Sequence, residues 1–303
     1  ECVQACPTGA LSPAKAAAHQ PADKTVDSVC PYCGVGCQLT YHVKGNTILR
    51  VEGRKGPANE GRLCVKGRYG FDYVHHEQRL TQPLIRREGV TKNPVDLLDP
   101  DQVNSAFRPA TWDEALALIA GRFKQIKSTH GGHALAGFGS AKCSNEEAYL
   151  FQKLVRTGFG TNNVDHCTRL CHASSVAALL EGIGSGAVSN PVMDVNQAEV
   201  IFVIGANPTV NHPVGATWIK NAVKNGAKLI VADPRRSDLA RHATHFLQFK
   251  ADSDVALLNA LLHIIIEENL IDREFIDQRT EGFQELKSNV ASCTPEAMSS
   301  ICG

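Results

Sequence analysis

The sequence of 303 residues lacks an excess of either charge and lacks any long apolar run. Its 31 lysine and arginine residues balance its 31 aspartate and glutamate residues. A chain without net charge or a basic tract offers no broad field to a nucleic acid or an anionic membrane. The longest apolar runs, such as Leu261–Ile266, are interrupted by His263 and are far too short to cross a bilayer. Composition therefore predicts no nucleic acid partner and no membrane insertion.

Three other common signals are missing. No initiator methionine and no signal peptide precede Glu1, so we expect a chain cut at its N-terminus, with any export signal upstream. No G-x-G-x-x-G follows a predicted strand, so we expect no NAD site in this chain. The eleven cysteines are odd in number and mostly clustered, which argues against a disulfide framework. They favour metal chemistry in a reducing compartment, which we expect to be the cytoplasm.

The chain divides into three predicted regions. Residues 1–25 contain ECVQACPTGAL and a linker rich in Ala, Pro and Lys, residues 26–75 form a small cysteine-dense domain, and residues 76–303 alternate strands with helices. In the small domain, QLTYHVK and NTILRVEG flank a Gly45-Asn46 turn, which predicts a hairpin. The alternation after residue 76 predicts an α/β domain with a doubly wound parallel sheet.

Turn and capping signals place the elements of this larger region. Capping boxes at Thr111 and Ser144 predict two helix starts. The expected strands are 133–139, 198–205, 227–233 and 245–250. The expected helices run from Thr111 to about His130, from Ser144 to near Gly158 and Gly160, onward from Pro213, and over Asp252–Asn269.

The first cysteine cluster lies in CPYCGVGC and GRLCVKG, which contain Cys30, Cys33, Cys37 and Cys64. Four thiolates at a C-x2-C-x3-C…C spacing hold an iron–sulfur cluster or zinc. Zinc sites usually pair two C-x2-C knuckles, which are not present here, so a 4Fe–4S cluster is favoured over zinc and over a structural role. Gly34 and Gly36 let backbone N–H groups turn toward cluster sulfurs.

The start of the chain carries a second, weaker signal. Cys2-x3-Cys6-Pro7 matches the end of a bacterial ferredoxin run, C-x2-C-x2-C-x3-C-P. In such runs the last cysteine serves the other cluster of a pair, so Cys2 and Cys6 are predicted to bind two different clusters. The alternative is two cysteines without a metal in a frayed terminus.

The segment NNVDHCTRLCHASS contains Cys167, Cys171 and His172. Cys171 has several possible roles, including packing, half of a disulfide, a zinc ligand, a haem anchor, a nucleophile or a ligand to a heavier metal. A haem anchor needs C-x2-C-H, and zinc would need two more ligands nearby. SSVAALLEG predicts a helix after His172, so Cys171 is expected in a loop before a helix N-terminus, where the thiolate is favoured. Cys167 is expected to be a packing residue.

Five motifs occur in a specific order, namely CPYCGVGC, GRLCVKG, NNVDHCTRLCHASS, IGANPTVNHP and ADPRR. This combination resembles the catalytic subunits of molybdenum- or tungsten-dependent formate dehydrogenases. These belong to the bis-pterin guanine dinucleotide family. The N-terminal cysteines resemble the lead-in of soluble, NAD-linked members. The likeness extends over nearly the whole chain, and family members are much longer, so we expect a second half after Gly303, including the arginine that binds substrate.

The resemblance implies roles for individual residues. The four cysteines of the first cluster would hold a 4Fe–4S cluster next to a pterin. Lys66 would lie between that cluster and the pterin, unless it is a plain surface lysine. Cys171 would ligate molybdenum or tungsten, and a soft thiolate suits such a centre. His172 would be the active-site histidine that accepts or positions a proton, with helix capping as its alternative.

The pterin guanine dinucleotide would need contacts at the carboxyl ends of strands, where ligands bind in open α/β sheets. The candidates are Gly205, Asn207, Asp233, Arg235, Asp254 and Lys142. Asp254 has simple N-capping as an equal alternative. Arg169 is a candidate only for structure or pterin contact. Cys143 stands where the resemblance implies a small residue, which argues against close approach of the backbone at that point. Cys293 and Cys302 are predicted bystanders.

The implied reaction is the reversible oxidation of formate to CO2, with electrons passing Lys66 to the first cluster and on to the N-terminal clusters. NAD would be reduced on partner subunits that carry flavin and iron–sulfur groups. Three alternatives remain, namely a nitrate reductase of the same fold, an electron-wiring subunit related to respiratory complex I, and a zinc-binding module. The Cys171-His172 pair favours formate over nitrate, and a metal-ligand cysteine argues against the wiring subunit. The isolated piece is predicted to be inactive.

Overall fold

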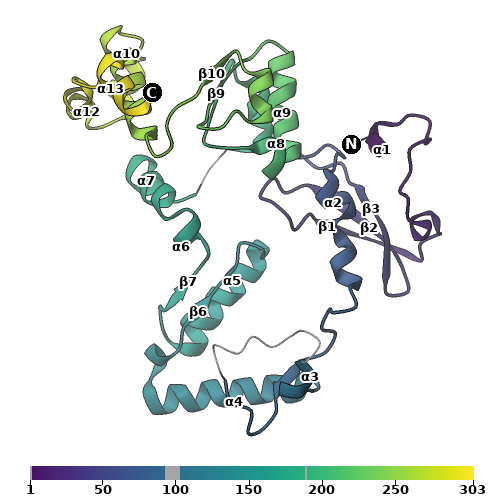
Figure 1. Cartoon of the computed structure of the whole chain (residues 1–303). Helices are drawn as coiled ribbons and strands as arrows, with labels where there is room; N and C mark the ends of the chain where they lie inside the picture. Colours follow the sequence, from purple (N-terminus) through teal and green to yellow (C-terminus); the bar gives the residue numbers. More distant parts are fainter. Residues whose placement is uncertain (1, 93–102, 188–189) are drawn as a thin grey trace. The chain divides into compact units, whose positions relative to one another are not determined.

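The computed structural model describes residues 2–92, 103–187 and 190–303. The chain forms two compact units. Unit 1 comprises Glu1–Tyr32, Gly36–Gly56 and Glu60–Asn190, and unit 2 comprises Cys33–Val35, Pro57–Asn59 and Pro191–Gly303. In Figure 1, unit 1 runs from purple to teal and most of unit 2 runs from green to yellow.

Unit 1 begins with a three-stranded antiparallel sheet in the order β1-β2-β3, formed by Lys24–Val29, Gln38–Lys44 and Thr47–Gly53. The predicted hairpin is confirmed, because Lys44 pairs with Thr47 and Gly45 takes the positive φ of 57° that such a turn needs. β1 was not predicted as a strand, since its six residues are all exposed and carry no alternating pattern. Leu39 of β2 and Val51 of β3 are buried, at 1% and 2% exposure, and anchor the sheet in the interior of this unit.

The segment before Cys64 packs tightly on this sheet. A Cβ added at Gly53, the last residue of β3, would stand 1.9 Å from the carbonyl oxygen of Gly61. Only glycine permits this approach. Leu63 is 1% exposed, and the short helix α2 (Val65–Tyr69) starts beside it. The close approach thus brings the GRLCVKG motif against the end of β3, which pairs with β2, the strand that follows CPYCGVGC.

The two predicted capping boxes differ in the structure. Ser144 opens α5 (Asn145–Lys153) with a complete box, since its hydroxyl accepts from Glu147 N at 3.2 Å and the Glu147 carboxylate accepts from Ser144 N at 2.7 Å. Thr111 opens α4 (Trp112–His130) and accepts from Glu114 N at 3.2 Å. The Glu114 carboxylate turns to Arg108 at 2.5 Å instead, so the Thr111 box is half formed.

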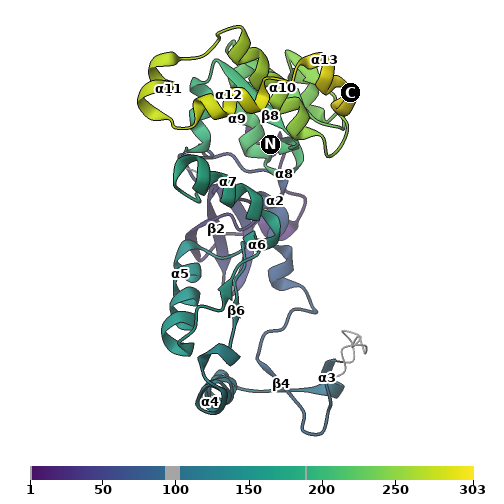
Figure 2. The same cartoon turned by 90° about the vertical axis from the view of Figure 1, so that its left-hand side faces the viewer.

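The strand expected over 133–139 was too long, and only Gly137–Phe138 forms β6, which pairs in parallel with β7 (Val164–Asp165). The side-chain amide of Asn163 donates to the carbonyls of His133 and Leu135 at 3.0 and 3.3 Å, where a strand partner would otherwise bind. α5 runs beside this pair in both Figure 1 and Figure 2, continues as a π-helix (Leu154–Phe159) and stops at Gly160 with φ 77°, as predicted.

Unit 2 is built on a parallel sheet in the order β10-β9-β8, with β8 at Val200–Ile204, β9 at Lys228–Ala232 and β10 at His245–Leu247. α9 (Pro213–Lys224) connects β8 to β9. Leu229 and Val231 of β9 are fully buried and pack with Leu239 and Ala222. The strands predicted at 198–205, 227–233 and 245–250 are confirmed. The first two are shorter than predicted at both ends, and the third is shorter at its C-terminal end.

The long apolar helix is confirmed as α10 (Asp254–Glu267), which contacts α12 and α13 in the yellow part of Figure 2. Within the described ranges, no helix is long and apolar enough to span a membrane. The remaining helices and strands are α1 (Cys2–Ala5), η1 (Ala16–His19), η2 (Gly70–His75), β4 (Leu84–Arg86), α3 (Val103–Ala106), β5 (Phe107–Pro109), η4 (Gly132–Ala134), α6 (Thr168–Cys171), α7 (Ala173–Ile183), η6 (Val192–Gln197), α8 (Pro208–Asn211), η7 (Asp238–His242), α11 (Arg273–Arg279), α12 (Phe283–Val290) and α13 (Pro295–Cys302).

The predicted α/β class is confirmed. An antiparallel cysteine-bearing sheet comes first, and parallel strands connected by helices come after it. The parallel pairing is divided between two small sheets, β6-β7 in unit 1 and β8-β9-β10 in unit 2.

Candidate functional site

Three of the four cysteines in the first cluster lie on neighbouring elements of unit 1. Cys30 follows β1 and Cys37 precedes β2, and Cys30 N donates to Cys37 O at 2.8 Å. Both residues are buried, at 8% and 5% exposure. Cys64 is the N-cap of α2, whose Gly67 lies so close to Cys30 that an added Cβ would stand 3.5 Å from its Sγ. The CPYCGVGC and GRLCVKG motifs are therefore packed together at Cys30 and Gly67.

Cys33 is half-buried and belongs to the short segment grouped with unit 2. Across the described ranges, no three His, Cys, Asp or Glu side chains are gathered into a group that could hold a metal ion. Cys64 and Cys33 remain partly accessible, and none of the eleven cysteines, all within the described chain, forms a disulfide. Four thiols of this spacing, two of them buried, fit an iron–sulfur cluster by the chemistry of the donor set.

Tyrosines surround the Cys30 side of this cluster. Burial raises the pKa of Tyr32, and the nearby charges of Tyr73 and Cys30 raise it further. Burial likewise raises the pKa of Tyr41, with the same two neighbours adding to the effect. The Tyr32 hydroxyl donates a short hydrogen bond to the carbonyl of Gly70, at the end of α2. Both phenols therefore stay protonated at neutral pH, and that of Tyr32 ties the CPYC loop to the end of α2, the helix that carries Lys66.

The N-terminal cysteines lie in and just after α1, a helix of four residues. Cys2 is exposed and begins α1, and Cys6 is half-buried just after it. A hydrogen bond with the Thr8 hydroxyl is the main cause that lowers the pKa of the Cys6 thiol to about 7. Cys6 is therefore substantially ionised at neutral pH, the state in which a thiol binds a metal.

The DHCTRLCH segment is organised by its own polar side chains. Asp165 accepts from Arg169 Nε at 2.8 Å and from His166 N at 2.8 Å, and these two bonds lower the pKa of the Asp165 carboxyl. His166 Nδ1 accepts from Thr168 N at 3.1 Å. Arg169 therefore has the structural role considered for it, as the local brace of α6.

Cys171 and His172 lie side by side between α6 and α7. Cys171 is the last residue of α6, so it lies at a helix end rather than in the predicted loop. His172 is the N-cap residue of α7 but makes no side-chain cap bond, so the capping alternative is wrong. Both are exposed, and the described residues provide no hydrogen-bond or ion-pair partner for either side chain. Cys167 is also exposed, so the expectation that it packs in the interior is wrong.

The candidate pterin contacts of unit 2 meet at one sheet edge. Ile204 pairs with Ala232 in parallel, so Gly205 and Asp233 leave adjacent strands at the same edge. Gly205 takes φ 58° and donates to Ala232 O at 2.9 Å. Asn207 is the N-cap residue of α8, and its Oδ1 accepts from Thr209 at 2.7 Å. The Asp233 carboxylate accepts from Arg235 N at 2.7 Å. Arg235 itself is exposed.

Ser237 in the same loop was not predicted. It is 7% exposed, and its hydroxyl has no hydrogen-bond partner among the described residues. A buried hydroxyl without a partner fits a polar ligand at this edge, so the residues present fit a dinucleotide. The sequence signal was the ADPRR run itself, which continues to Ser237. Asp254 begins α10, but Ser253 occupies the N-cap position, so simple N-capping by Asp254 is wrong.

Lys142 lies in unit 1, in the loop between β6 and α5. Its ammonium group donates to Tyr32 O at 3.4 Å and lies 5.7 Å from the centre of the Tyr32 ring. Lys142 therefore touches the CPYC loop, a contact that was not foreseen. Cys143, the next residue, is exposed. Of the two predicted bystanders, Cys293 is half-buried, and Cys302 is buried in the cluster with Ala232 and Phe249.

The fold, the four-cysteine spacing and the sheet edge define a molybdopterin enzyme, and the chain belongs to the molybdopterin oxidoreductase family. The family model described as molybdopterin oxidoreductase matches residues 79–299. The model described as molybdopterin oxidoreductase Fe4S4 domain matches residues 23–76. These matches support the predicted molybdenum or tungsten pterin and the 4Fe–4S cluster as cofactors.

Relatives make the likeness more specific. The F420-dependent formate dehydrogenase subunit alpha of Methanocaldococcus jannaschii is 42% identical over 281 residues, covering 92% of this chain and 39% of that protein. Formate dehydrogenase H of Escherichia coli is 42% identical over 285 residues, covering 92% of this chain and 38% of that protein. The chain thus spans about two fifths of the length of these relatives.

Among solved structures, acetylene hydratase from Pelobacter acetylenicus matches with a TM-score of 0.73 at 22% identity, covering 91% of this chain and 36% of that one. At this identity the match supports the fold alone. It is consistent with an iron–sulfur domain followed by a molybdopterin oxidoreductase domain.

Proposed function

We propose that the protein to which this chain belongs oxidises formate to CO2 at a molybdenum or tungsten pterin centre. The observation that carries this proposal is the Cys171-His172 pair, whose two exposed side chains have no partner among the described residues, in a chain 42% identical to formate dehydrogenase subunits. The balanced half-reaction is HCOO⁻ → CO2 + H⁺ + 2e⁻. When bound, the metal centre would receive the two electrons.

The chain would supply the thiolate and the proton acceptor. Cys171 lies at the end of α6, where its exposed sulfur can ligate a soft metal. His172 is the next residue, and imidazole is suited to hold the released proton near neutral pH. Since neither its side chain nor that of Cys171 is engaged by another described residue, both can face the substrate.

The remaining residues would hold the cofactors. Gly205, Asn207, Asp233 and Arg235 would bind the dinucleotide at the edge of the unit 2 sheet, with Asp254 and Lys142 as further candidates. Cys30, Cys33, Cys37 and Cys64 would hold the 4Fe–4S cluster, and Lys66 on α2 would lie on the electron path. Cys2 and Cys6 would serve further clusters that lead electrons out.

The electron acceptor is the least constrained part of the proposal. We propose partner subunits with flavin and iron–sulfur groups that reduce NAD, in the cytoplasm. The support is the ferredoxin-like spacing of Cys2 and Cys6. The name of the M. jannaschii relative assigns F420 to that protein, so F420 is the acceptor to test beside NAD.

The test is electron paramagnetic resonance on the anaerobic full-length protein, before and after formate is added. We expect a Mo(V) or W(V) signal together with reduced iron–sulfur signals. Metal analysis that finds iron without molybdenum or tungsten would contradict the catalytic proposal. If formate changes nothing, but nitrate reoxidises the dithionite-reduced centres, the function is nitrate reduction.

A further inference from the structure

The segment before β1 is docked on the antiparallel sheet of unit 1. Ala18 is 6% exposed, and Lys15 pairs with Asp72 of η2 at 2.5 Å. Asp23 N donates to Val43 O at 2.8 Å, and its carboxylate accepts from Gly45 N at 2.7 Å. The part of the chain expected to be a linker is therefore held along η1 by several independent contacts.

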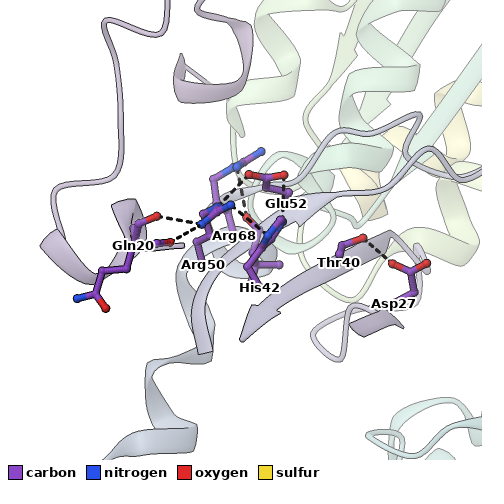
Figure 3. A network of polar contacts seen from close by, with 9 residues as sticks. Gln20, Asp27, Thr40, His42, Arg50, Glu52 and Arg68 are labelled. Carbon is purple, nitrogen blue, oxygen red and sulfur yellow. Dashed lines mark hydrogen bonds and ion pairs between the residues drawn. The ribbon is translucent and has the colours of Figure 1, made fainter. Parts of the chain in front are cut away.

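Arg50 of β3 makes the central contacts with this segment. Its Nη1 donates to the carbonyl oxygens of Ala18 and Gln20, both at 3.3 Å. Its Nε donates to Glu52 Oε1 at 3.1 Å. Figure 3 shows the guanidinium between Gln20 and the His42–Glu52 pair. One side chain thus joins the N-terminal segment to the sheet.

His42 is placed so that only its neutral form supports this arrangement. It lies opposite Arg50 in the β2–β3 register. Arg50 Nη2 lies 3.1 Å from His42 Nδ1, and Glu52 Oε2 lies 3.1 Å from His42 Nε2. A guanidinium only donates and a carboxylate only accepts, so Nδ1 is an acceptor and Nε2 carries the hydrogen. A second proton on Nδ1 would point at the N–H of Arg50.

The groups that face His42 set the direction of the pH effect. Its side chain is 15% exposed. Arg50 and Glu52 face it from β3, and β1 presents the uncharged Thr25. Burial works against ionisation of Glu52, but hydrogen bonds from Arg50 and the nearby His42 outweigh it and lower the pKa of this carboxyl. Glu52 therefore stays ionised over the range in which histidines ordinarily titrate, about pH 5 to 8.

Two other cations contact the same strand and the same N-terminal segment. Arg68 of α2 donates to Val51 O at 3.3 Å, and Lys44 donates to the Gln20 side chain at 3.4 Å. Two more histidines lie close. His19 contacts Pro13 O at 2.9 Å, and His75 accepts from Ile48 N at 3.0 Å. Any test must separate these two from His42.

We propose that Arg50 is a positioning residue that clamps the N-terminal segment to the cluster-bearing sheet, and that protonation of His42 releases the clamp. Cys2 and Cys6 lie at the free end of this segment. Held at Ala18, the chain back to Cys6 can extend at most about 40 Å, and released as far as Asp23, whose bonds to Val43 and Gly45 do not involve Arg50, it can extend about 55 Å. The clamp thus limits how far the N-terminal thiols move from Cys30 and Cys37. This consequence rests on the proposed electron route, whereas the clamp itself does not.

Amide hydrogen exchange on the full-length protein tests the clamp. The reporters are the amides of Ala18 and Gln20, which donate to Lys15 O and Ala17 O, and the Asp23 amide, which donates to Val43 O, is a control within the same segment. The amides of Gly205 and Lys228 in unit 2 are the internal control for folding. Arg50→Gln should lower protection of the two reporters about tenfold or more and leave the controls unchanged. Arg54→Gln is the matched variant, because Arg54 pairs with Asp27 at 3.6 Å.

His42→Gln tests the release. A glutamine accepts from Arg50 and donates to Glu52 but does not change charge. After correction for intrinsic exchange rates, reporter protection in the wild type should fall by about tenfold or more between pH 8 and 5. His42→Gln should remove this fall, and His19→Gln and His75→Gln should retain it.

Three results would overturn the proposal. Unchanged protection in Arg50→Gln would show that Arg50 does not clamp the segment. Constant protection from pH 8 to 5, or the same fall in His42→Gln as in the wild type, would remove His42 as the release. The proposed function is read separately, since reduction of the iron–sulfur signals by formate does not depend on these amides.

Discussion

The antiparallel sheet of unit 1 and the α6–α7 segment both present cysteines, but they present them in opposite ways. Cys30 and Cys37 are buried at the ends of strands, next to a helix whose glycine packs on the sulfur. Cys167 and Cys171 are exposed on one helical turn that is braced by an exposed ion pair. A cluster that only transfers electrons is protected by burial, whereas a thiol that meets a substrate must be reachable. The contrast accords with the proposal that Cys30 and Cys37 hold a buried cluster and that Cys171, but not Cys167, binds the reacting metal.

The sharpest test of this contrast is Cys171→Ala in the full-length protein. We expect formate turnover to fall on the order of a thousandfold or more, because a ligand to the reacting metal is removed. Iron content should be unchanged and stability should shift by no more than about 0.5 kcal/mol, since the side chain is exposed. Cys167→Ala, on the same short segment, is the control and should keep its turnover. Full activity in Cys171→Ala would end its assignment as the ligand.

Cys37→Ser tests the other side of the comparison. We expect loss of the 4Fe–4S signal, a lower unfolding temperature and a fall in turnover on the order of 100-fold, because a buried ligand is replaced by a weaker one. Iron analysis and thermal unfolding measure the result. Cys293→Ser is the control, since that half-buried cysteine has no cluster spacing. Retained iron in Cys37→Ser would argue that burial there serves packing alone.

Lys66→Ala addresses the path that would join the two regions. We expect formate to reduce the metal centre at the normal rate. Reduction of the iron–sulfur cluster should be about tenfold slower, which is the size of effect expected when a residue that supports a metal site is lost. Rapid-freeze paramagnetic resonance separates the two steps. Lys55→Ala, elsewhere in the same domain, is the control. Equal cluster reduction in both variants would make Lys66 a bystander.

Ser144→Ala tests how far the region before α6 relies on local capping. The complete box at α5 should lose about 1 kcal/mol of helix stability. Amide exchange along α5 measures this loss, with Ser128→Ala near the end of α4 as a control. An unchanged α5 would show that contacts of Phe151 and Val155 with β6 dominate over the cap.

The smallest expected effect concerns the Asp165–Arg169 brace. Its hydrogen bonds lower the pKa of Asp165 in the folded chain, so their stabilisation is complete above the ordinary aspartate pKa of about 3.9. It is lost as the pH falls through the lowered value. Exchange of the His166 amide should therefore be constant from pH 8 to 5, after intrinsic correction, and accelerate in acid. Asp165→Ala, which removes both acceptor oxygens, should show the faster exchange at every pH.

Much of the architecture could be predicted because it rests on local rules. The hairpin at Gly45 and the stop at Gly160 result from the backbone preferences of glycine, and the Ser144 box results from hydrogen bonds between two residues three apart. The length of the 133–139 strand could not be predicted, because Asn163, 30 residues after His133, takes the carbonyls that a strand would use. The second half of the Thr111 box failed for a similar reason, since Arg108 competes for Glu114.

The candidate site divides in the same way. Its thiol spacing, the adjacent cysteine and histidine, and the polar turns after β8 and β9 were readable from the sequence, since metal ligands and strand ends leave compositional marks. Three features of the described residues could not be predicted from the sequence. They are the exposure of Cys167, the unpartnered hydroxyl of Ser237 and the contact of Lys142 with Tyr32. Each depends on which surfaces are covered, and a one-dimensional pattern does not record this.

The sequence by itself determined the chemistry of this protein, since side-chain type and spacing decide which metals and ligands can bind. Only the tertiary structure decided which cysteines are buried, that His42 stands between Arg50 and Glu52, and that the segment before β1 lies on the sheet. Hydrogen bonds and burial between residues far apart in the chain depend on folded geometry, so they had to be observed.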